Sequence, residues 1–353
     1  MPKDAVPLGE IARALVVKLR HHGDVLLATP VLAVLKSHAP ALEIDALVYD
    51  DTAPMLEGHP ALSALHAVGR NWRSAGPLER LASEWRLLAD LRARGYGLIV
   101  HLSEHPRGAW LARLLGARFS VAPRVPGRGR FWERSFTHFY ALPANGRRHA
   151  VELNLDALRR IGIQPAIGGR RVQFVPGAEA EARVRALVPE GGFVQLHPGS
   201  RWSFKSWTAE GNAALLQRLA ADGHRVVLTS APAPQELALA AEIERRAPGA
   251  ALNLAGRLSL KELGALAARA RLFIGVDSMP MHLAAAMGTP VVALFGPSGE
   301  HEWGPWHVPH RVVASGHPCR PCGNDGCGGG KVSECLTALP VDAVHAAARE
   351  LLA

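Results

Sequence analysis

Hydrophobic and polar residues along the chain alternate between two kinds of pattern. Short apolar runs, typical of strands buried on both faces, are followed by longer segments whose apolar residues recur every three or four positions, as in a helix with one buried side. The runs that we predict as strands are 14–19, 43–49, 65–68, 98–102, 119–122, 193–197, 225–229, 251–253, 272–276 and 291–295. The segments that we predict as helices are 25–37, 51–57, 78–94, 107–115, 149–161, 208–222, 234–247, 259–270 and 341–352. A further helix is predicted to begin after Ser278 and to end at residue 287.

Strands that alternate with helices in this way predict an α/β fold with parallel sheets covered by helices on both faces. The glycine- and proline-rich segment 162–178 interrupts the alternation and is predicted to be a linker. A length of 353 residues suits two domains of ordinary size. We therefore expect two Rossmann-like, doubly wound domains that face a central cleft. They are predicted over residues 1–170 and 171–340, with a C-terminal helix over 341–353.

One strand–helix–strand segment, residues 271–298, carries an unusual concentration of polar side chains. Asp277 and Ser278 follow an apolar run and are predicted to cap a helix, with Pro280 in its first turn, where proline is tolerated. Asp277, Ser278 and His282 thus surround a helix start, whose N–H groups and dipole favour phosphate binding. The alternative is an ordinary capped turn of an α/β protein.

A second polar turn, residues 20–24, joins a predicted strand to a predicted helix in the first half of the chain. Ligands of open α/β sheets bind beyond the carboxyl ends of the strands, so such turns are candidate sites. Gly23 permits a tight turn, and Asp24 stands at the start of the helix. A capping role would also explain Asp24.

Two more polar turns follow strands in the second half. Residues 197–207 carry a hydroxyl at Ser200 and an ammonium at Lys205. Lys205 stands between aromatic residues and is either placed to hold a phosphate or is a surface lysine beside core tryptophans. Glu236, one turn into the following helix, could accept hydrogen bonds from a ribose or could complement the helix dipole.

Several common nucleotide-binding and catalytic motifs are absent from the sequence. It contains no G-x-x-x-x-G-K-[ST], no G-x-G-x-x-G after a strand, and no G-x-S-x-G, H-E-x-x-H or D-x-D. A phosphate-bearing ligand would therefore be held by helix N-termini, serine and lysine, rather than by a P-loop or a metal bound to D-x-D.

Composition describes a folded, basic protein, with 48% hydrophobic and 20% charged residues and a net charge of +9. Arginine clusters at 124–134, 147–148, 159–160 and 170–171 favour an anionic partner, although a solvated arginine-rich surface would have the same composition. No RNA-recognition, zinc-finger or helix-turn-helix signature accompanies the charge, so we do not expect nucleic acid to be the partner.

The sequence has no apolar run of the roughly 18 residues that a membrane span needs. Residues 1–7 lack the basic and apolar regions of a secretory signal. We expect a cytoplasmic protein that reaches a membrane only peripherally.

Four cysteines form a C-x2-C-x4-C-x7-C run in a glycine-rich loop. In a reducing compartment such a run could hold structural zinc, although the spacing is not a standard zinc pattern. Free thiols, or a disulfide formed on handling, are the alternatives. The four are Cys319, Cys322, Cys327 and Cys335.

Sequence motifs spread over nearly the whole chain resemble those of one enzyme family. The matching stretches are 17–27, 98–102, 134–138, 197–202, 222–230, 254–258 and 275–297. With these motifs the chain resembles the bacterial lipopolysaccharide core heptosyltransferases, which are family 9 of the glycosyltransferases, and looks most like the heptosyltransferase III type. The segment 275–297 is the most specific of the motifs.

The resemblance implies a GT-B fold with a sugar-nucleotide donor in the C-terminal domain and the acceptor facing the N-terminal one. The donor would be ADP-L-glycero-β-D-manno-heptose, and the acceptor the anionic heptose/Kdo inner core of lipopolysaccharide at the inner membrane. The reaction would invert the anomeric centre without a catalytic metal or other cofactor. We expect a monomer that works at the cytoplasmic face of this membrane.

The resemblance also implies roles for individual residues, which we transfer from the family to the matching positions of this chain. Asp24 matches the candidate general base, with Gly23 and Arg20 on the acceptor side, and Lys205 matches a lysine that contacts the diphosphate. The donor-binding positions are Ser200, Lys205, Glu236, Gly256, Asp277, Ser278, Met279 and His282. Met279, Pro280 and Met281 stand where many members have small residues, so backbone and side-chain contacts both remain open there.

Other functions also fit the sequence. The chain could be a GT-B transferase for another nucleotide sugar or acceptor, and donor screening would separate these enzymes. It could instead be a non-catalytic nucleotide-sugar-binding protein, although the presence of both Asp24 and Lys205 favours an enzyme. A nucleic-acid-binding protein is suggested by charge alone.

Overall fold

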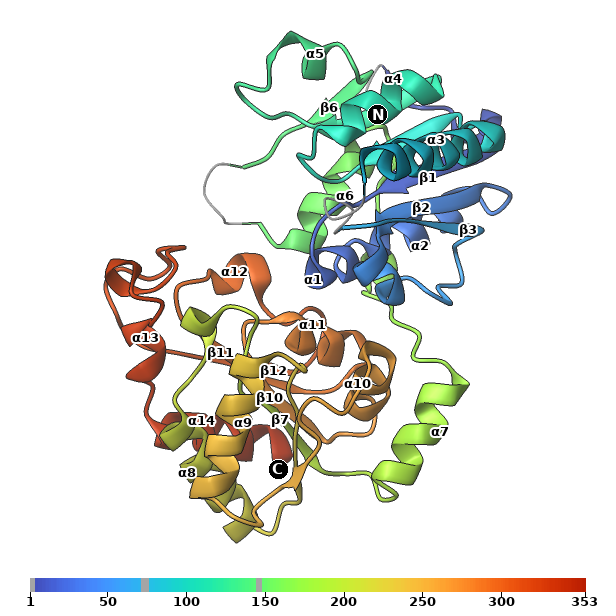
Figure 1. Ribbon diagram of the computed structural model, residues 1–353. Coiled ribbons are helices and arrows are strands. Elements are labelled where there is room, and N and C mark those ends of the chain that lie inside the picture. The colour runs from blue at the N-terminus through green and yellow to red at the C-terminus, as the bar shows by residue number, and fades with distance from the viewer. Residues whose placement is uncertain (1–3, 71–75, 144–147) are drawn as a thin grey trace. The chain divides into compact units, whose positions relative to one another are not determined.

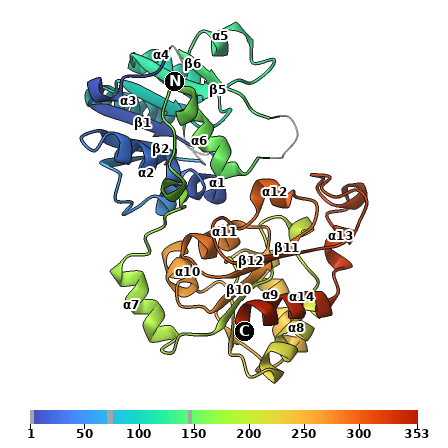
Figure 2. The same cartoon turned by 180° about the vertical axis from the view of Figure 1, so that it is seen from behind.

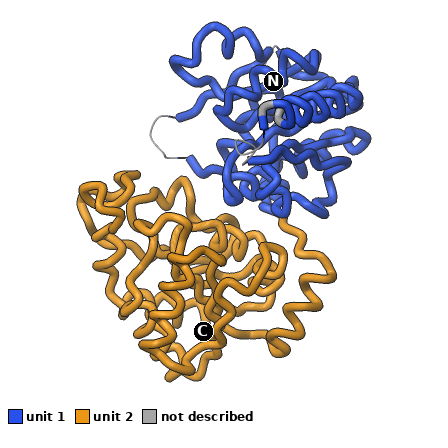
Figure 3. Tube along the Cα trace, viewed as in Figure 1, with its two compact units in different colours: residues 1–173 blue, residues 174–353 orange. Residues whose placement is uncertain are grey.

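Each half of the chain folds around a six-stranded parallel sheet, as the alternating pattern predicts (Figure 1). The structure is a computed structural model that describes residues 4–70, 76–143 and 148–353. It divides into two compact units, residues 1–173 and 174–353, which meet inside the predicted linker (Figure 3).

In unit 1 the strands follow the order β3-β2-β1-β4-β5-β6. Their bounds are β1 Arg13–Val17, β2 Glu43–Tyr49, β3 Ala64–Val68, β4 Leu98–His101, β5 Phe119–Pro123 and β6 His138–Tyr140. The helices are α1 His22–Leu26, α2 Thr29–His38, α3 Pro77–Arg94, α4 Arg107–Leu115, α5 Gly129–Glu133 and α6 Ala150–Arg160. Helices α3 and α4 lie on one face of the sheet, and α2 and α6 lie on the other (Figures 1 and 2).

In unit 2 the order is β12-β11-β10-β7-β8-β9. The strands are β7 Val194–His197, β8 Val226–Leu228, β9 Leu252–Asn253, β10 Leu272–Val276, β11 Val291–Phe295 and β12 His310–Ala314. The helices are α7 Ala178–Leu187, α8 Ala209–Ala221, α9 Pro234–Arg246, α10 Leu260–Ala267, α11 Met279–Ala286, α12 Glu300–Trp303, α13 Glu334–Thr337 and α14 Val341–Leu352. The C-terminal helix α14 belongs to this unit, because Val344 and Ala348 are buried in its core with residues of α8 and α9.

Both sheets have the same doubly wound topology. In unit 1 the two central strands, β1 and β4, pair with each other, with Val17 opposite His101. In unit 2 the corresponding strands are β7 and β10, with His197 opposite Gly275. The strand order reverses between these central pairs, and ligands of such folds bind in the crevice beyond the carboxyl ends of the strands at this point.

The helix predicted over 25–37 is wrong, because the structure has two helices there, α1 and α2, separated at Leu27 and Ala28. Pro30 is the second residue of α2. Inside a longer helix its ring would clash with the carbonyl group four residues earlier, and it has no N–H to donate, so a new helix begins around it instead.

Short or irregular elements were also predicted incorrectly. The helix predicted over 51–57 is a 3₁₀ helix, Asp50–Met55, with Pro54 inside it. The sequence pattern did not reveal α5, β6, α7, α12, α13 or β12. Most of these elements are five residues or shorter, which is too short for a periodicity to appear.

Among the described residues, no helix is both long and apolar enough to cross a bilayer.

Candidate functional site

The polar turns of unit 2 come together at the carboxyl ends of neighbouring strands. The loop that carries Lys205 follows β7, and Asp277 follows β10, the strand paired with β7. Glu236 lies in the first turn of α9, which follows β8 on the other side of β7. The candidate donor residues therefore lie around the point where the strand order of this sheet reverses.

The turn between β10 and α11 differs in one detail from the predicted cap. Ser278 occupies the N-cap position, but its side chain makes no capping hydrogen bond and its Oγ instead donates to the carbonyl oxygen of Val276 at 3.3 Å. Pro280 is within the first turn, as predicted. Pro280 has no N–H, and the N–H of Met281 donates to the carbonyl oxygen of Ser278 at 3.1 Å. The N–H of Met279 has no side-chain cap, which leaves it available to an anionic ligand.

Three side chains of α11 have different environments. Met281 is fully buried in a core cluster with residues of β10 and β11, so its side chain has a packing role. Met279 is only partly buried at the first position of α11, where a ligand could still reach it. His282 is buried, and its ring lies 6.4 Å from that of Trp303, measured between centroids.

Lys205 and Asp277 form the central ion pair of this site. Lys205 Nζ donates to Asp277 Oδ2 at 2.7 Å, and the Asp277 side chain is 7% exposed against 24% for Lys205. An ammonium group carries three donors, so this contact leaves N–H groups on its more exposed side for a second anion. Of the two tryptophans near Lys205, Trp207 is a core residue, as one alternative predicted, but Trp202 is 47% exposed.

Glu236 is more deeply buried than the sequence suggested and has a histidine partner. His197 Nε2 lies 3.6 Å from Glu236 Oε2, and His197 Nδ1 lies 3.0 Å from Thr229 Oγ1. Burial acts to raise the pKa of Glu236, but the hydrogen bond and charge of His197, with the N–H of Ala231, hold this pKa below its usual value. His197 was not predicted as a site residue, although a histidine that ends a buried strand is a usable signal.

Ser200 and Gly256 help to set the backbone conformation of the loops around the site. Ser200 is buried, and its Oγ accepts a hydrogen bond from the N–H of Trp202 at 3.1 Å. Gly256 has a φ of +69°, and a Cβ there would lie 2.7 Å from Cδ2 of Leu237. This position requires glycine for its backbone conformation and for space.

In unit 1, Asp24 lies within α1 rather than at its N-cap. The N-cap is His21, and Asp24, the third helical residue, accepts a hydrogen bond from the His21 N–H at 3.3 Å in a capping box. Its other oxygen lies 3.7 Å from Nε of Arg20, and its side chain is 15% exposed. Gly23 precedes it in the same helix. Asp24 is thus a capping carboxylate that remains partly open to solvent.

A buried lysine lies behind Asp24, and the sequence analysis did not select it. Lys18 directly follows β1, and its Nζ donates to the carbonyl oxygen of Leu102 at 2.8 Å and to Oδ1 of Asn154 at 2.9 Å. Burial lowers the pKa of Lys18 to about 8, and attraction to Asp24 acts in the opposite direction. The signal was a single lysine that ends an apolar strand.

The predicted arginine clusters separate into two groups. Arginines on and near α6 are paired with acidic residues: Arg148 with Asp156, Arg159 with Glu152, Arg160 with Asp4 and Arg170 with Glu152. Arg147 lies outside the described residues. The cluster at 124–134 is exposed and is considered below.

The four cysteines do not form a preassembled metal site. Cys319, Cys322 and Cys327 are exposed and Cys335 is buried, and all four thiols are free. Within the part of the chain that the structure describes, no three histidine, cysteine, aspartate or glutamate side chains are arranged to hold a metal ion.

Comparisons with known proteins agree with this architecture. The model of glycosyltransferase family 9 (heptosyltransferase) matches residues 84–332. The chain is 38% identical over 293 residues to lipopolysaccharide heptosyltransferase 3 of Escherichia coli, covering 82% of this chain and 84% of that protein. A solved family 9 glycosyltransferase from Veillonella parvula matches with a TM-score of 0.84 at 21% identity, over 99% of each chain.

The E. coli heptosyltransferase WaaC, solved with ADP, matches with a TM-score of 0.73 at 21% identity, over 96% of this chain and 99% of that one. These structural matches agree with a GT-B fold. Together the family model, the sequence relative and the fold show that this chain belongs to glycosyltransferase family 9, the heptosyltransferases.

Proposed function

We propose that this protein is an inverting heptosyltransferase that moves L-glycero-D-manno-heptose from ADP-heptose to the heptose/Kdo inner core of lipopolysaccharide. The observation that carries the proposal is the Lys205–Asp277 pair beside the uncapped start of α11, at the strand-order reversal of unit 2. Membership of family 9 and the likeness to a lipopolysaccharide heptosyltransferase 3 support the same reaction.

On the donor side, the diphosphate would contact Lys205 and the N–H of Met279 at the start of α11, and Glu236 would accept hydrogen bonds from the ribose. Lys205 and this N–H supply positive charge where negative charge grows on the departing ADP, which is the main electrostatic requirement of the step. The remaining donor contacts would come from Ser200, Gly256, Asp277, Ser278, Met279 and His282.

On the acceptor side, Asp24 would take the proton of an acceptor hydroxyl, with Arg20 and Gly23 beside it. The acceptor oxygen attacks the anomeric carbon, the bond from this carbon to the ADP oxygen breaks, and its electron pair leaves with ADP. One displacement of this kind inverts the anomeric centre. The partly exposed carboxylate of Asp24 suits this role, because a general base must be reached by its substrate.

The proposed reaction needs no catalytic metal, because Lys205 and the start of α11 take over charge stabilisation. We propose that the enzyme works as a monomer at the cytoplasmic face of the inner membrane. Transfer that is unchanged by a chelator would support the metal-independent step, and transfer that a chelator abolishes and a divalent ion restores would contradict it.

The test is transfer in vitro to truncated core acceptors, with ADP-heptose, UDP-GlcNAc and GDP-mannose offered separately and the product linkage analysed. Asp24→Asn is expected to lower kcat by about 10²–10⁴ while ADP binding, measured by calorimetry, changes little. Asp342→Asn, at a side chain that is 84% exposed in unit 2, is the matched control.

The outcomes separate the alternatives. Transfer from a different nucleotide sugar would replace the proposed donor. Tight ADP binding without turnover in the natural protein would indicate a non-catalytic binding protein. If Asp24→Asn abolished ADP binding as well, Asp24 would be structural and the assignment of the base would be wrong.

A further inference from the structure

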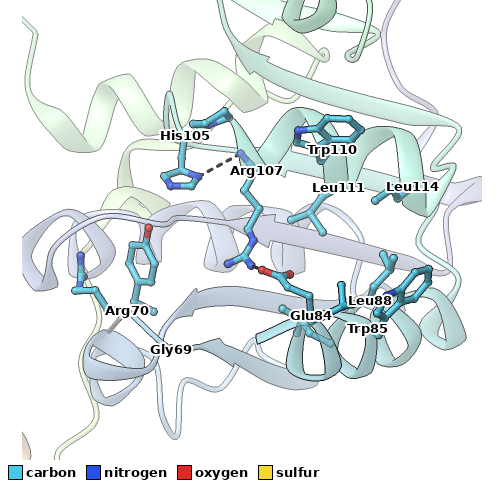
Figure 4. A pocket seen from close by; sticks show the side chains of 14 residues that line it. Gly69, Arg70, Glu84, Trp85, Leu88, His105, Arg107, Trp110, Leu111 and Leu114 are labelled. Atoms are coloured by element: carbon cyan, nitrogen blue, oxygen red, sulfur yellow. Dashed lines mark hydrogen bonds and ion pairs between the residues drawn. The ribbon is translucent and has the colours of Figure 1, made fainter. Parts of the chain in front are cut away.

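A groove on unit 1 lies outside the residues assigned to the transfer reaction. It has a volume of ≈ 850 Å³ and runs between α3 and α4 (Figure 4). Arg70 and His105, which follow β3 and β4, line one end, and Trp85 and Trp110 lie toward the other. The groove therefore leads from the carboxyl edge of the sheet, where ligands of this fold bind, to the outer surface of two helices.

One ion pair joins the two walls of the groove. Arg107, the first residue of α4, reaches across to Glu84 of α3, and the side chain of Arg107 is 15% exposed (Figure 4). The positive charge of Arg107 thus neutralises the negative charge of Glu84 inside the groove. The remaining side chains on these walls that are close to solvent are mostly apolar.

A patch of exposed apolar side chains surrounds this groove. Trp85 is 62% exposed and Trp110 57% exposed, and the ring of Trp110 lies 4.6 Å from that of Phe131 on α5, measured between centroids. Contiguous apolar surface of this kind marks a contact with a partner or a membrane. We call it the α3–α5 patch, and its members are Leu81, Trp85, Trp110, Leu114 and Phe131.

Positive charge adjoins the α3–α5 patch. Residues 107–134 contain seven arginines and one acidic residue, Glu133. Arg113 lies over the ring of Phe131, 4.7 Å from its centroid. Six arginines of this segment are exposed, and one of them, Arg118, pairs with Glu10. Among the described residues, no carboxylate forms an ion pair with the other five, in contrast to the paired arginines near α6. These five are Arg113, Arg124, Arg128, Arg130 and Arg134.

We propose that the α3–α5 patch docks onto the surface of an anionic lipid bilayer. Tryptophan rings favour the boundary between headgroups and acyl chains, and basic residues beside them are attracted to anionic lipid. A second copy of the chain fits less well, because a symmetric dimer through this face would bring two arginine-rich segments together. The inference rests on the proposed function in one respect only, because a bilayer surface is where a membrane-anchored acceptor would be presented to the enzyme.

The experiment is co-sedimentation of the full chain with vesicles of phosphatidylcholine alone, or with one third phosphatidylglycerol. Trp85→Ala/Trp110→Ala is expected to weaken binding to the anionic vesicles at least tenfold. Arg128→Gln/Arg130→Gln is expected to lower the preference for anionic vesicles by about tenfold or more, at about 1 kcal/mol for each charge. Ile167→Ala, which shortens an apolar side chain that is 78% exposed elsewhere in unit 1, is the matched control and should bind normally.

ADP binding by calorimetry is measured on the same variants and should not change, because the donor residues lie in unit 2. This readout keeps the proposal separate from the proposed function: failure to bind ADP would count against the donor site but not against the patch. Equal vesicle binding by the natural protein and Trp85→Ala/Trp110→Ala would overturn the docking proposal. The proposal would also be overturned if the natural protein bound no vesicles and instead formed a dimer that Trp85→Ala/Trp110→Ala abolishes.

Discussion

Replacing Lys18 with methionine is expected to abolish a rise in stability that the natural protein shows between pH 8 and about pH 10. Lys18 is 9% exposed, and its ammonium group donates to two neutral oxygen atoms, of Leu102 and Asn154. Burial therefore dominates the pKa of Lys18, lowering it from 10.5 to about 8. Methionine keeps the side chain as far as Cε but lacks the ammonium group, so it cannot titrate.

The direction of the effect follows from proton binding. Below pH 8 the lysine is protonated in the folded and unfolded chain alike, so the folded protein must hold a charge in its interior. Between pH 8 and 10.5 the unfolded chain binds a proton that the folded chain does not, and the free energy of unfolding therefore rises with pH. At about 1.4 kcal/mol for each pH unit, the whole interval amounts to about 3 kcal/mol.

The measurement is urea unfolding of the natural protein and Lys18→Met at pH 7, 8, 9 and 10. The difference between the two curves isolates Lys18, because the other titrating groups are common to both. Asn154→Asp is a second variant, in which a carboxylate beside the ammonium group should raise the pKa of Lys18 and move the rise to higher pH. Parallel curves for the natural protein and Lys18→Met would refute the argument, whatever the absolute stability of the variant.

Three further predictions concern other pairs. Lys205→Met is expected to lower kcat by about 10²–10³, as loss of one preorganised donor does, and a turnover within threefold of the natural enzyme would contradict the role of Lys205. His197→Gln removes the partner that keeps Glu236 ionised against its burial, so the pKa of Glu236 should rise. Calorimetry should then show that the variant loses more ADP affinity at pH 6 than at pH 8. An equal loss of affinity at both pH values would contradict this. Asp45→Asn breaks the buried contacts of Asp45 with Arg94 and Tyr96 and should cost about 3 kcal/mol in urea unfolding, whereas Asp325→Asn, in an exposed pair with Lys331, should cost less than about 1 kcal/mol.

The elements that the sequence predicts well are those in which one physical signal dominates. Strands β2, β10 and β11 and helices α4 and α14 have the predicted bounds, because long apolar or amphipathic patterns coincide with clear breaks at their ends. Strand β12 begins with exposed His310 and Arg311, so its apolar run is limited to residues 312–314. Its place at the edge of the sheet depends on pairing with β11, which local sequence does not encode.

The candidate site divides in the same way. Asp24, Asp277 and Glu236 could be selected from the sequence, because polar residues after buried strands are conspicuous. Lys18 and His197 were not selected, because their roles depend on contacts that only the folded chain brings together. The ammonium of Lys18 meets a carbonyl oxygen 84 positions away in the sequence, and Lys205 meets Asp277 across 72 positions.

The two units build opposite chemistry on one topology. In unit 1 a buried ammonium, Lys18, lies behind a more accessible carboxylate, Asp24, and attracts it. In unit 2 a buried carboxylate, Asp277, lies behind a more accessible ammonium, Lys205. The more accessible group is therefore negative in unit 1 and positive in unit 2. A transfer that must accept a proton from one substrate and stabilise negative charge on the other needs both polarities. Reversing the charge at Asp24 should therefore abolish proton acceptance in unit 1 and leave ligand binding by unit 2 intact. Reversing the charge at Lys205 should abolish charge stabilisation in unit 2 and leave ligand binding by unit 1 intact.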